Sequence, residues 1–384
     1  MKTIVVSAVN LNIGGTLTIL RECLSYLSGL SESGEYRVIA LVYKKELAFY
    51  PNIEYIEMQW PKKAWVNRLW CEYVTMNKIS KQLSPVFLWF SLHDTTPSVQ
   101  AERRVVYCHN SFPFYKWKLN ELFFAPKVVL FALFSKYAYQ KNIHQNKYIV
   151  VQQLWFKEQM VRLFKLDRKK VIIAPPSFTG RELNQESTSI TTNHKYTFFF
   201  AAAPDSHKNF ECICRAAQCL EKERNRSDFR VCITMHGTEN AYARWIDHKW
   251  GKKIKALEFI GYLDKESLYR YYGLCNCFIF PSKIETWGLP VTEFGAFSKP
   301  MLLADLPYAH ETAAGLSQVA FFNPDLPEQL AVMMEKMLLG DSGFLHYLLC
   351  LRHGGRRAFV RANFWAELRH GVMGGCCSDD PVCV

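Results

Sequence analysis

Short apolar runs alternate with helical stretches along the first half of this chain, and this alternation limits the possible folds more than any other feature. Leu17, Leu20, Leu24 and Leu27 mark one face of a helix that follows the first apolar run. Strands and helices in alternation predict a parallel sheet with helices on both faces. The predicted strands of this half are Thr3–Val9, Tyr36–Val42, Val86–Phe90, Arg104–Cys108 and Lys147–Gln152.

The second half repeats this pattern after a break in composition. The apolar segment Val171–Ser177 contains two prolines, and the polar stretch Thr179–His194 that follows is typical of an interdomain linker. We therefore predict an α/β protein of two Rossmann-like domains, at residues 1–175 and 176–340, whose parallel sheets face a central cleft. The predicted strands of the second domain are Tyr196–Ala203, Phe229–Met235, Leu257–Gly261, Cys277–Ser282 and Pro300–Ala304.

Size and composition agree with a globular protein of two domains. The chain has 384 residues, of which 49% are apolar and 21% charged. No uncharged apolar stretch reaches the ~18 residues of a membrane-spanning helix, and Met1–Gly15 indicates a strand and a glycine turn instead of a signal peptide. The 13 cysteines are scattered, and several lie in apolar strands. We expect most of them to be buried thiols in a reducing cytoplasm.

The formal net charge of +12 calls for an anionic partner, such as a nucleotide donor, a lipid surface or a nucleic acid. Basic and aromatic residues are interleaved in Pro61–Trp70 and in Tyr115–Lys127. Two interpretations stay open: these segments are solvated faces with a few anchoring aromatics, or they contact the anionic inner face of the cell membrane. No nucleic-acid-binding motif accompanies the charge, so we expect no nucleic-acid partner.

Two glutamates separated by seven residues, Glu285 and Glu293, lie in the segment Pro281–Pro300. In one continuous helix they would stand ~12 Å apart along the axis and roughly 80° apart around it, too far to grip one small group. Gly288 and Pro290 instead indicate a chain break followed by a helix start. With Glu285 on a loop and Glu293 in the first helical turn, the pair would hold opposite ends of an elongated ligand.

The helix start predicted between these glutamates would present backbone N–H groups, which favour a pyrophosphate. A sugar at one end, a diphosphate in the middle and a ribose at the other end would suit this arrangement. The segment therefore predicts a nucleotide-sugar site. The alternative is a surface loop with two solvated carboxylates.

The pattern P-S-x-x-E-T-x-G-L-P-x-x-E, preceded by an apolar strand, resembles the donor-site signature of family-4 (group 1) glycosyltransferases, which are retaining enzymes of the GT-B fold. Motifs that share this resemblance lie within residues 4–322. It implies an acceptor domain followed by a nucleotide-sugar donor domain. It also implies that Glu285 faces the transferred sugar and diphosphate, and that the donor is bound by Thr286, Gly288, Leu289, Pro290 and Glu293.

Lys208 follows the predicted strand Tyr196–Ala203 and precedes a predicted helix. In the GT-B arrangement a lysine at this point would neutralise a developing diphosphate leaving group. The family commonly has an arginine about five residues earlier, where this chain has Ala203. Either an arginine from elsewhere or Lys208 with the helix start would then serve the phosphates. The alternative role for Lys208 is that of an ordinary surface lysine.

His109 begins a loop at the carboxyl end of the strand Arg104–Cys108, where open α/β sheets bind ligands. The resemblance implies that it donates a hydrogen bond to a sugar hydroxyl or to the acceptor; the alternative is a histidine that caps its own loop.

Gly14 and Gly15 precede a helix expected near Thr16 and resemble the family's glycine-rich first loop, where the backbone approaches the donor phosphates or the acceptor. The chain has no G-x-G-x-x-G pattern, which argues against a nicotinamide cofactor.

Two further groups are assigned to the donor side. Gly237, Thr238 and Glu239 end a strand and recur in the family, and Tyr262 and Leu263 are expected under the nucleotide base. No D-x-D triplet is present, so we expect neither a metal nor another cofactor. A lysine and a helix dipole would then replace the cation's charge.

These expectations combine into one enzyme, a retaining hexosyltransferase that uses a UDP- or GDP-sugar and a saccharide or lipid-linked acceptor, in cell-surface polysaccharide or glycolipid synthesis. A nucleotide-sugar epimerase of the same fold and a non-catalytic sugar-binding protein are the alternatives.

Residues 341–384 are crowded with Gly, Arg, His and Cys, where a GT-B protein would carry a long amphipathic helix. A frameshift in the reading frame is our hypothesis for this tail.

Overall fold

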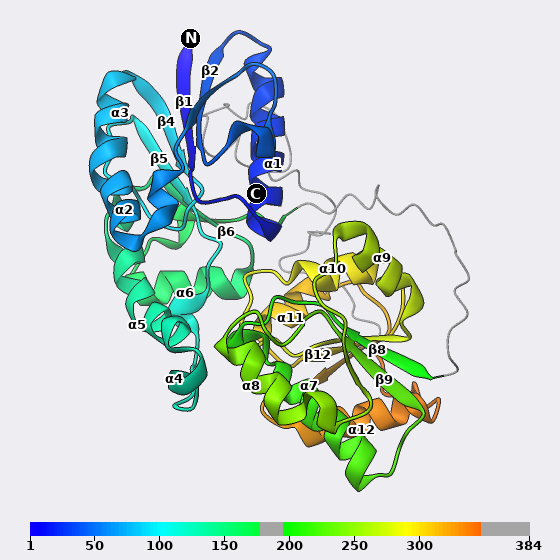
Figure 1. Ribbon diagram of the computed structural model, residues 1–384. Helices are drawn as coiled ribbons and strands as arrows, with labels where there is room; N and C mark the ends of the chain where they lie inside the picture. The colour runs from blue at the N-terminus through cyan, green and yellow to red at the C-terminus, as the bar shows by residue number, and fades with distance from the viewer. Residues whose placement is uncertain (177–194, 347–384) are drawn as a thin grey trace. The chain divides into compact units, whose positions relative to one another are not determined.

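The structure is a computed structural model that describes residues 1–176 and 195–346, and the described residues form two compact α/β units (Figure 1). The first unit contains residues 1–113 and 134–176, and the second contains residues 114–133 and 195–346. No sequence signal indicated that residues 114–133 would pack with the second unit. The boundary near residue 175 stays a prediction, because residues 177–194 lie outside the described part. Most of the tail, residues 347–384, lies outside it as well.

The first unit is built on a seven-stranded sheet in the order β3-β2-β1-β4-β5-β6-β7, in which every pair of neighbours is parallel. The apolar runs predicted as strands form β1, β2, β4, β5 and β6, while β3 and β7 were not predicted. The strands are β1 (Lys2–Ala8), β2 (Tyr36–Val42), β3 (Ile53–Glu57), β4 (Val86–Ser91), β5 (Arg103–Tyr107), β6 (Tyr148–Val151) and β7 (Val171–Ile173).

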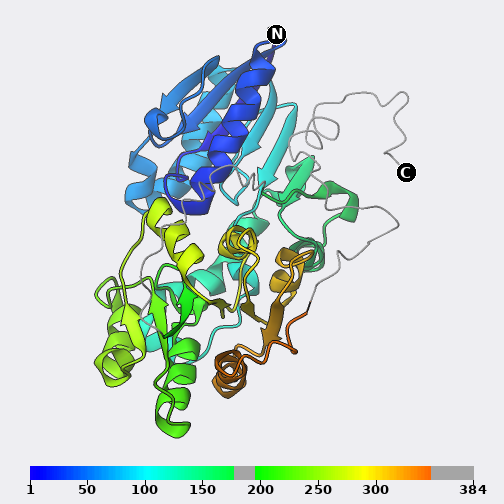
Figure 2. The same cartoon turned by 90° about the vertical axis from the view of Figure 1, so that its right-hand side faces the viewer.

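Helices cover both faces of this sheet because alternate residues of its central strands are buried on opposite sides. Ile4 and Val6 pack in one cluster with Leu20 and Leu24 of α1, as the leucine spacing predicted, whereas Val5 packs on the other side with Met76 of α3. Figure 2 shows α1 across one face. The helices are α1 (Gly14–Ser31), α2 (Trp65–Trp70), α3 (Met76–Gln82), α5 (Pro126–Gln140, which begins in the second unit) and α6 (Leu154–Phe164), with short turns η1 (Lys45–Ala48), η2 (Trp60–Lys63), η3 (Cys71–Thr75), η4 (Phe112–Phe114), η5 (Ile143–Gln145) and η6 (Arg168–Lys170).

The second unit repeats the architecture around a six-stranded parallel sheet in the order β10-β9-β8-β11-β12-β13. β11 and β12 are buried along their whole length, as strands covered on both faces must be. β13 was not predicted. The strands are β8 (Tyr196–Phe200), β9 (Phe229–Ile233), β10 (Leu257–Phe259), β11 (Cys277–Phe280), β12 (Met301–Ala304) and β13 (Val319–Phe322).

Most helices of the second unit connect these strands, whereas α4 belongs to the segment 114–133 and α12 follows β13; α7 packs against α12. They are α4 (Glu121–Phe124), α7 (Phe210–Gln218), α8 (Ala241–Trp250), α9 (Lys265–Leu274), α10 (Leu289–Gly295), α11 (Pro307–Thr312) and α12 (Pro327–Leu338), with η7 (Ser206–Lys208), η8 (Cys219–Glu223) and η9 (Gly251–Lys253). No helix among the described residues is both long and apolar enough to cross a bilayer.

The cysteines of the described segments are buried and free, as expected for structural thiols. Burial raises the pKa of the Cys108 thiol, and it raises that of Cys277 in β11 in the same way. Such thiols are protonated and behave as small apolar side chains. The nine concerned are Cys23, Cys71, Cys108, Cys212, Cys214, Cys219, Cys232, Cys275 and Cys277.

A buried polar cluster holds the loop after β4 in the first unit. Glu72 and His93 are both 0% exposed. Arg68 donates to Glu72 Oε1 at 2.8 Å and to the His93 carbonyl oxygen at 2.7 Å, so this basic residue points inward although it lies in the segment predicted to be a surface. Nε2 of His93 lies 2.9 Å from Ser7 Oγ, and Thr95 Oγ1 donates to Glu72 Oε2 at 2.5 Å. Burial lowers the pKa of His93 to about 4.

This low pKa predicts that acid destabilises the first unit. Unfolded histidine has a pKa of about 6.5, so below that pH the unfolded state binds a proton that the folded His93 does not. Between pH 7 and pH 5 His93 alone should remove about 2 kcal/mol from the free energy of unfolding. The urea midpoint should therefore fall on acidification, and less steeply in His93→Gln. The exposed His248→Gln is the control and should keep the wild-type slope; equal slopes in all three proteins would contradict the prediction.

Candidate functional site

The segment with the two glutamates folds as a strand, a loop and a short helix in the second unit. β11 ends at Phe280, the loop 281–288 follows, and α10 begins at Leu289 with Pro290 in its first turn, where Gly288 and Pro290 predicted a helix start. Gly288 precedes the helix with φ of +88°, in the left-handed region that glycine adopts readily. A side chain at this position would strain the turn that separates Glu285 from the helix.

Glu285 forms an ion pair with Lys208. Nζ of Lys208 lies 2.5 Å from Oε1 of Glu285, and the two side chains are only 19% and 14% exposed. The contact is possible because β8 and β11 are neighbours in the sheet, so the loops at their carboxyl ends meet at one edge. Both residues were predicted to belong to the site, but their contact was not.

Glu293 occupies a different position from the expected one. It is the fifth residue of α10 and lies in the second turn, because the helix already begins at Leu289. Burial raises the pKa of the Glu293 carboxyl, which the positive charge of Lys265 at the start of α9 partly offsets. A half-buried carboxylate of this kind gains from a hydrogen-bond donor such as a hydroxyl group.

The helix start offers fewer amides to a phosphate than the sequence implied. Pro290 has no N–H, and the Val291 N–H donates to the Gly288 carbonyl oxygen at 2.9 Å. Thr286 and Leu289 lie on either side of Gly288 along the same turn. A diphosphate bound here would depend more on Lys208 and less on the helix dipole than predicted.

Residues outside the predicted site hold this loop in place. The Tyr308 hydroxyl donates to the Ser282 carbonyl oxygen at 2.7 Å, and Thr312 Oγ1 donates to the Trp287 carbonyl oxygen. Trp287 Nε1 donates to Thr292 Oγ1 at 2.9 Å. Tyr308 and Thr312 come from α11, which follows the next strand of the sheet. Their pairing is non-local, so no motif in the sequence marks it.

The loop after β9 carries Gly237, Thr238 and Glu239. The carboxylate of Glu239 accepts the backbone N–H groups of His236 at 2.5 Å and Gly237 at 2.9 Å. Although burial opposes the shift, these donors lower the pKa of Glu239. Glu239 thus stabilises its own loop. Gly237 has φ of +90°, and a Cβ there would lie 2.7 Å from that of Asp247.

The loop after β10 lies beside the β9 loop, since the Gly261 N–H donates to the Met235 carbonyl oxygen at 3.1 Å. Tyr262 follows and is 85% exposed, whereas Leu263 is half-buried. An exposed aromatic ring at the carboxyl edge of the sheet can stack on a base. The expected contact of Tyr262 and Leu263 with a nucleotide stays a prediction.

The position of the family's arginine is occupied here by Ala203, which is exposed after β8. Lys283 is the next basic residue to consider, because it precedes Glu285 by two positions. Its Nζ lies 3.0 Å from Glu211 Oε1 and 3.9 Å from Glu121 Oε1, and its side chain is 10% exposed. These two carboxylates already neutralise Lys283, so it does not replace the arginine in this state.

The remaining predicted residues lie in the first unit. α1 begins at Gly14, earlier than the expected start near Thr16, and Gly14 has φ of +60° while Gly15 is the next helical residue. His109 follows β5, which ends at Tyr107, and its Nε2 lies 2.9 Å from the Leu92 carbonyl oxygen. Burial lowers the pKa of His109. His109 thus contacts the loop after β4, and its role at a substrate stays a prediction.

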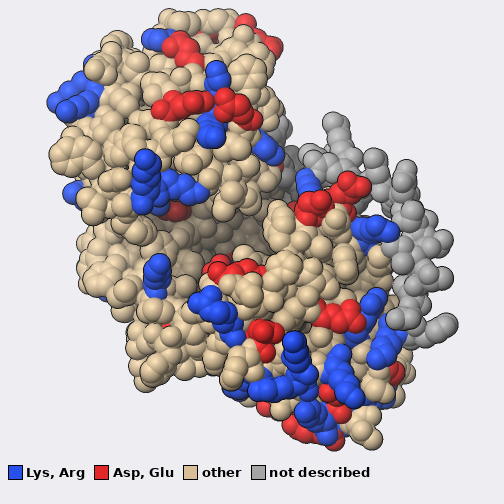
Figure 3. Space-filling view, viewed as in Figure 1, with Lys and Arg blue, Asp and Glu red and all other residues tan. Residues whose placement is uncertain are grey.

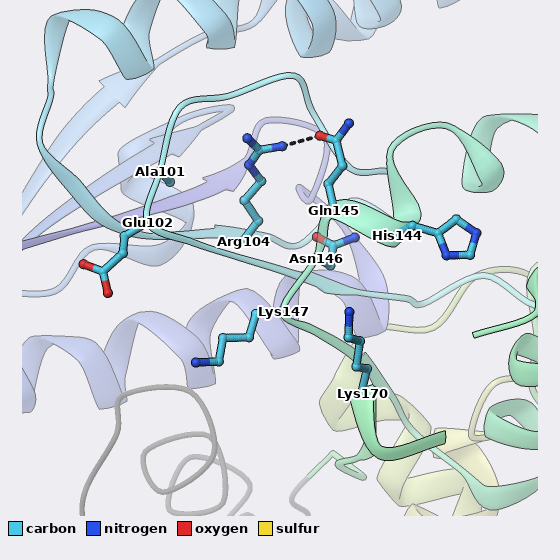
Figure 4. A pocket seen from close by; sticks show the side chains of 8 residues that line it. All are labelled: Ala101, Glu102, Arg104, His144, Gln145, Asn146, Lys147 and Lys170. Carbon is cyan, nitrogen blue, oxygen red and sulfur yellow. Dashed lines mark hydrogen bonds between the residues drawn. The ribbon is translucent and has the colours of Figure 1, made fainter. Parts of the chain in front are cut away.

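A pocket of about 510 Å³ opens at the other edge of the first unit's sheet, where β5 and β6 begin (Figure 4). It is lined by Ala101, Glu102, Arg104, His144, Gln145, Asn146, Lys147 and Lys170. No predicted site residue is among them. In residues 1–176 and 195–346, no three His, Cys, Asp or Glu side chains group closely enough to hold a metal ion.

Known proteins that are similar to this chain in sequence or in fold include glycosyltransferases. Residues 181–344 match the family model described as Glycosyl transferases group 1. The chain is 20% identical over 235 residues to the O-antigen chain mannosyltransferase RfbU of Salmonella typhimurium, covering 61% of this chain and 60% of that protein. It therefore spans less than two thirds of that relative.

Solved glycosyltransferases share the fold over nearly the whole chain. HepE of Anabaena, in complex with UDP and glucose, superposes with a TM-score of 0.59 at 11% identity, covering 90% of this chain and 92% of HepE. The lipopolysaccharide outer core galactosyltransferase WaaB superposes with a TM-score of 0.60 at 9% identity, covering 97% and 99%. The predicted resemblance to group 1 glycosyltransferases and the predicted GT-B fold are confirmed. Family 4 and retention of configuration are not specified by these matches.

The Lys208–Glu285 pair predicts how a nucleoside diphosphate binds. Lys208→Ala should weaken UDP or GDP binding about ten- to a hundredfold, because a charged hydrogen bond of roughly 1.5–3 kcal/mol is lost. Binding of the matching nucleoside, which has no phosphate, should not change. Calorimetric titration measures both. The exposed Lys195→Ala, before β8, is the control, and equal losses for nucleoside and diphosphate in Lys208→Ala would disprove the assignment.

Proposed function

We propose that this protein transfers a hexose from a UDP- or GDP-sugar to a saccharide or lipid-linked acceptor, with retention of configuration. The observation that supports it most is the Lys208–Glu285 pair at the carboxyl edge of β8 and β11, inside the part of the chain that matches group 1 glycosyltransferases. Retention and the hexose come from the family resemblance. A place in cell-surface polysaccharide or glycolipid synthesis follows from the O-antigen mannosyltransferase and the lipopolysaccharide galactosyltransferase among its relatives.

In this proposal the diphosphate displaces Glu285 from Lys208. Lys208 then neutralises the charge that develops on the leaving diphosphate, in a site where the ammonium group is already positioned and shielded. Glu285, released from the lysine, accepts a hydrogen bond from the transferred sugar. The leaving diphosphate takes the proton of the attacking acceptor hydroxyl on the same face of the sugar, so no protein nucleophile is required.

Glycosyl transfer is tested with the purified protein, a panel of UDP- and GDP-sugars and candidate saccharide acceptors. We expect slow release of nucleoside diphosphate from one donor without acceptor, faster release with acceptor, and a product with the donor's anomeric configuration by NMR. A changed sugar on an intact nucleotide would indicate an epimerase instead. Binding of nucleotide sugars without turnover under any condition would indicate a non-catalytic protein.

The two glutamates should have unequal kinetic effects. Glu285→Gln should lower kcat more than it raises KM, because a contact that strengthens in the transition state is removed. Glu293→Gln should mainly raise the donor KM, by about ten- to a hundredfold, if Glu293 binds the ribose hydroxyls. Steady-state kinetics with the identified donor measure both. Wild-type kcat and KM in both variants would refute the donor-clamp interpretation.

Contact with an anionic membrane, and a cytoplasmic location at its inner face, also belong to the proposal. The supporting observation is the exposed apolar side chains within both basic segments: Trp65, Val66, Leu69, Trp70, Leu119, Leu122 and Phe123. On the face of the first unit that Figure 3 shows, in the upper part of the view, Lys and Arg are scattered among mostly uncharged atoms. Trp and Phe favour the interfacial region of a bilayer, and lysines nearby attract anionic headgroups.

Vesicle binding tests this contact. The protein should sediment with vesicles that contain anionic lipid and less so as salt is raised, because exposed charges are screened over about 10 Å at 0.1 M salt. Changing the exposed pair Lys62 and Lys63 to Gln should reduce binding. Arg68 is left unchanged because it supports the buried Glu72. The matched control changes the exposed pair Lys252 and Lys253 to Gln; equal binding to neutral and anionic vesicles would rule the contact out.

A further inference from the structure

Glu121 is a buried carboxylate in the segment 114–133, which packs with the second unit. It opens the short helix α4 and is 1% exposed. A carboxylate taken out of water costs several kcal/mol unless it is paired and hydrogen-bonded. The partners of such a carboxylate must compensate this cost, so its contacts indicate which segments of the chain it holds together.

Its contacts are numerous. The Tyr115 hydroxyl lies 2.8 Å from Oε2 and 3.0 Å from Oε1, and the Lys118 backbone N–H donates to Oε1 at 3.1 Å. These two come from the same segment. The other two partners come from distant parts of the chain: Ser206 Oγ donates to Oε2 at 3.0 Å, and Lys283 Nζ lies 3.9 Å from Oε1.

The distant partners lead to the ion pair of the site. Ser206 is the first residue of η7, and Lys208 is the last. Lys283 precedes Glu285 by two residues, and its backbone N–H donates to the His207 carbonyl oxygen at 2.8 Å. Glu121 therefore contacts both loops that bring Lys208 and Glu285 together, without touching either residue of that pair.

We propose that Glu121 is a positioning residue for the diphosphate site. It fixes η7 and the segment 283–285, so that the side chains of Lys208 and Glu285 keep their positions relative to each other. The inference rests on the proposed function, since it concerns the lysine assigned to the leaving diphosphate. Displacing a positioned catalytic group by about 1 Å can cost about a hundredfold in rate while leaving binding of the remaining substrate groups intact.

The rest of the segment is anchored independently of Glu121. Lys118 Nζ lies 2.6 Å from Asp325 Oδ1 in an exposed ion pair, and the Phe124 ring stacks on Trp245 with centroids 4.7 Å apart. Removing the charge of Glu121 should therefore loosen its contacts with Ser206 and Lys283 while the segment stays in place. This separation of anchoring from positioning makes the proposal testable.

The experiment measures donor kinetics in a double-mutant cycle. Glu121→Gln keeps the size of the side chain, but its amide meets the donors Tyr115, Lys118 N–H and Ser206 with only one acceptor oxygen. We expect kcat to fall about ten- to a hundredfold, and the donor KM to rise by less than the ten- to hundredfold loss of diphosphate binding expected for Lys208→Ala, because the lysine is displaced but not removed. In the Lys208→Ala background the same change should lower kcat by a clearly smaller factor than in the wild type, because one of the two groups being positioned is gone.

Lys118→Gln is the matched control, since it breaks an exposed contact of the same segment and should stay within about twofold of wild-type kcat. Ser206→Ala, which removes one hydrogen bond to Glu121, should lower kcat by about three- to tenfold and decides the question if Glu121→Gln does not fold. A wild-type kcat in Glu121→Gln, or an undiminished effect in the Lys208→Ala background, would overturn the inference alone. A wild-type protein inactive with every donor would overturn the proposed function, and the inference with it.

Discussion

The ion pair of Lys208 and Glu285 is the contact on which the proposed site in the second unit depends. It exists because β8 and β11 are parallel neighbours, so the loops that carry the two residues leave the sheet at the same edge. Both charges are largely shielded from water, which makes each dependent on the other. In the proposed function, an anionic ligand competes with Glu285 for Lys208, and the ligand that does so best also offers Glu285 a new hydrogen-bond donor.

The glutamates of this unit differ in their partners, and only these surroundings distinguish one glutamate from another. Glu239 is satisfied by backbone N–H groups of its own loop, and Glu121 is enclosed by Tyr115, Ser206 and Lys283. Glu285 instead has a partner that a ligand could replace, and Glu293 is half-buried with a raised pKa. Two of these residues are therefore suited to bind a ligand. The charge of Glu293 is only partly compensated by the protein, and the partner of Glu285 is one that a ligand could replace.

Local signals explain which parts of this structure could be predicted from sequence. Most buried strands and the glycine before α10 depend on neighbouring residues, so apolar runs and the Gly288-Leu289-Pro290 order indicated them; β13 is buried as well but was not predicted. β3 was missed because Glu54 and Glu57 interrupt its apolar pattern at the sheet edge. The packing of residues 114–133 with the second unit was missed because it depends on Ser206 and Lys283, which are far away in sequence. Segment Tyr115–Lys127 resembles a solvated face although it contains the buried Glu121.

The same non-local contacts bear on the arginine that this chain lacks. Lys283 is close in sequence to Glu285, yet it forms ion pairs with Glu211 and Glu121. Lys265 lies near Glu293. Glu121, Glu211, Glu285 and Glu293 thus each have a lysine near them, but two of these glutamates share Lys283, so the free site carries no excess positive charge. A diphosphate adds negative charge to that balance. Because Lys208 already has Glu285 as its partner, the proposed diphosphate binding breaks one ion pair to form another, which would favour a ligand whose sugar hydroxyls then compensate Glu285.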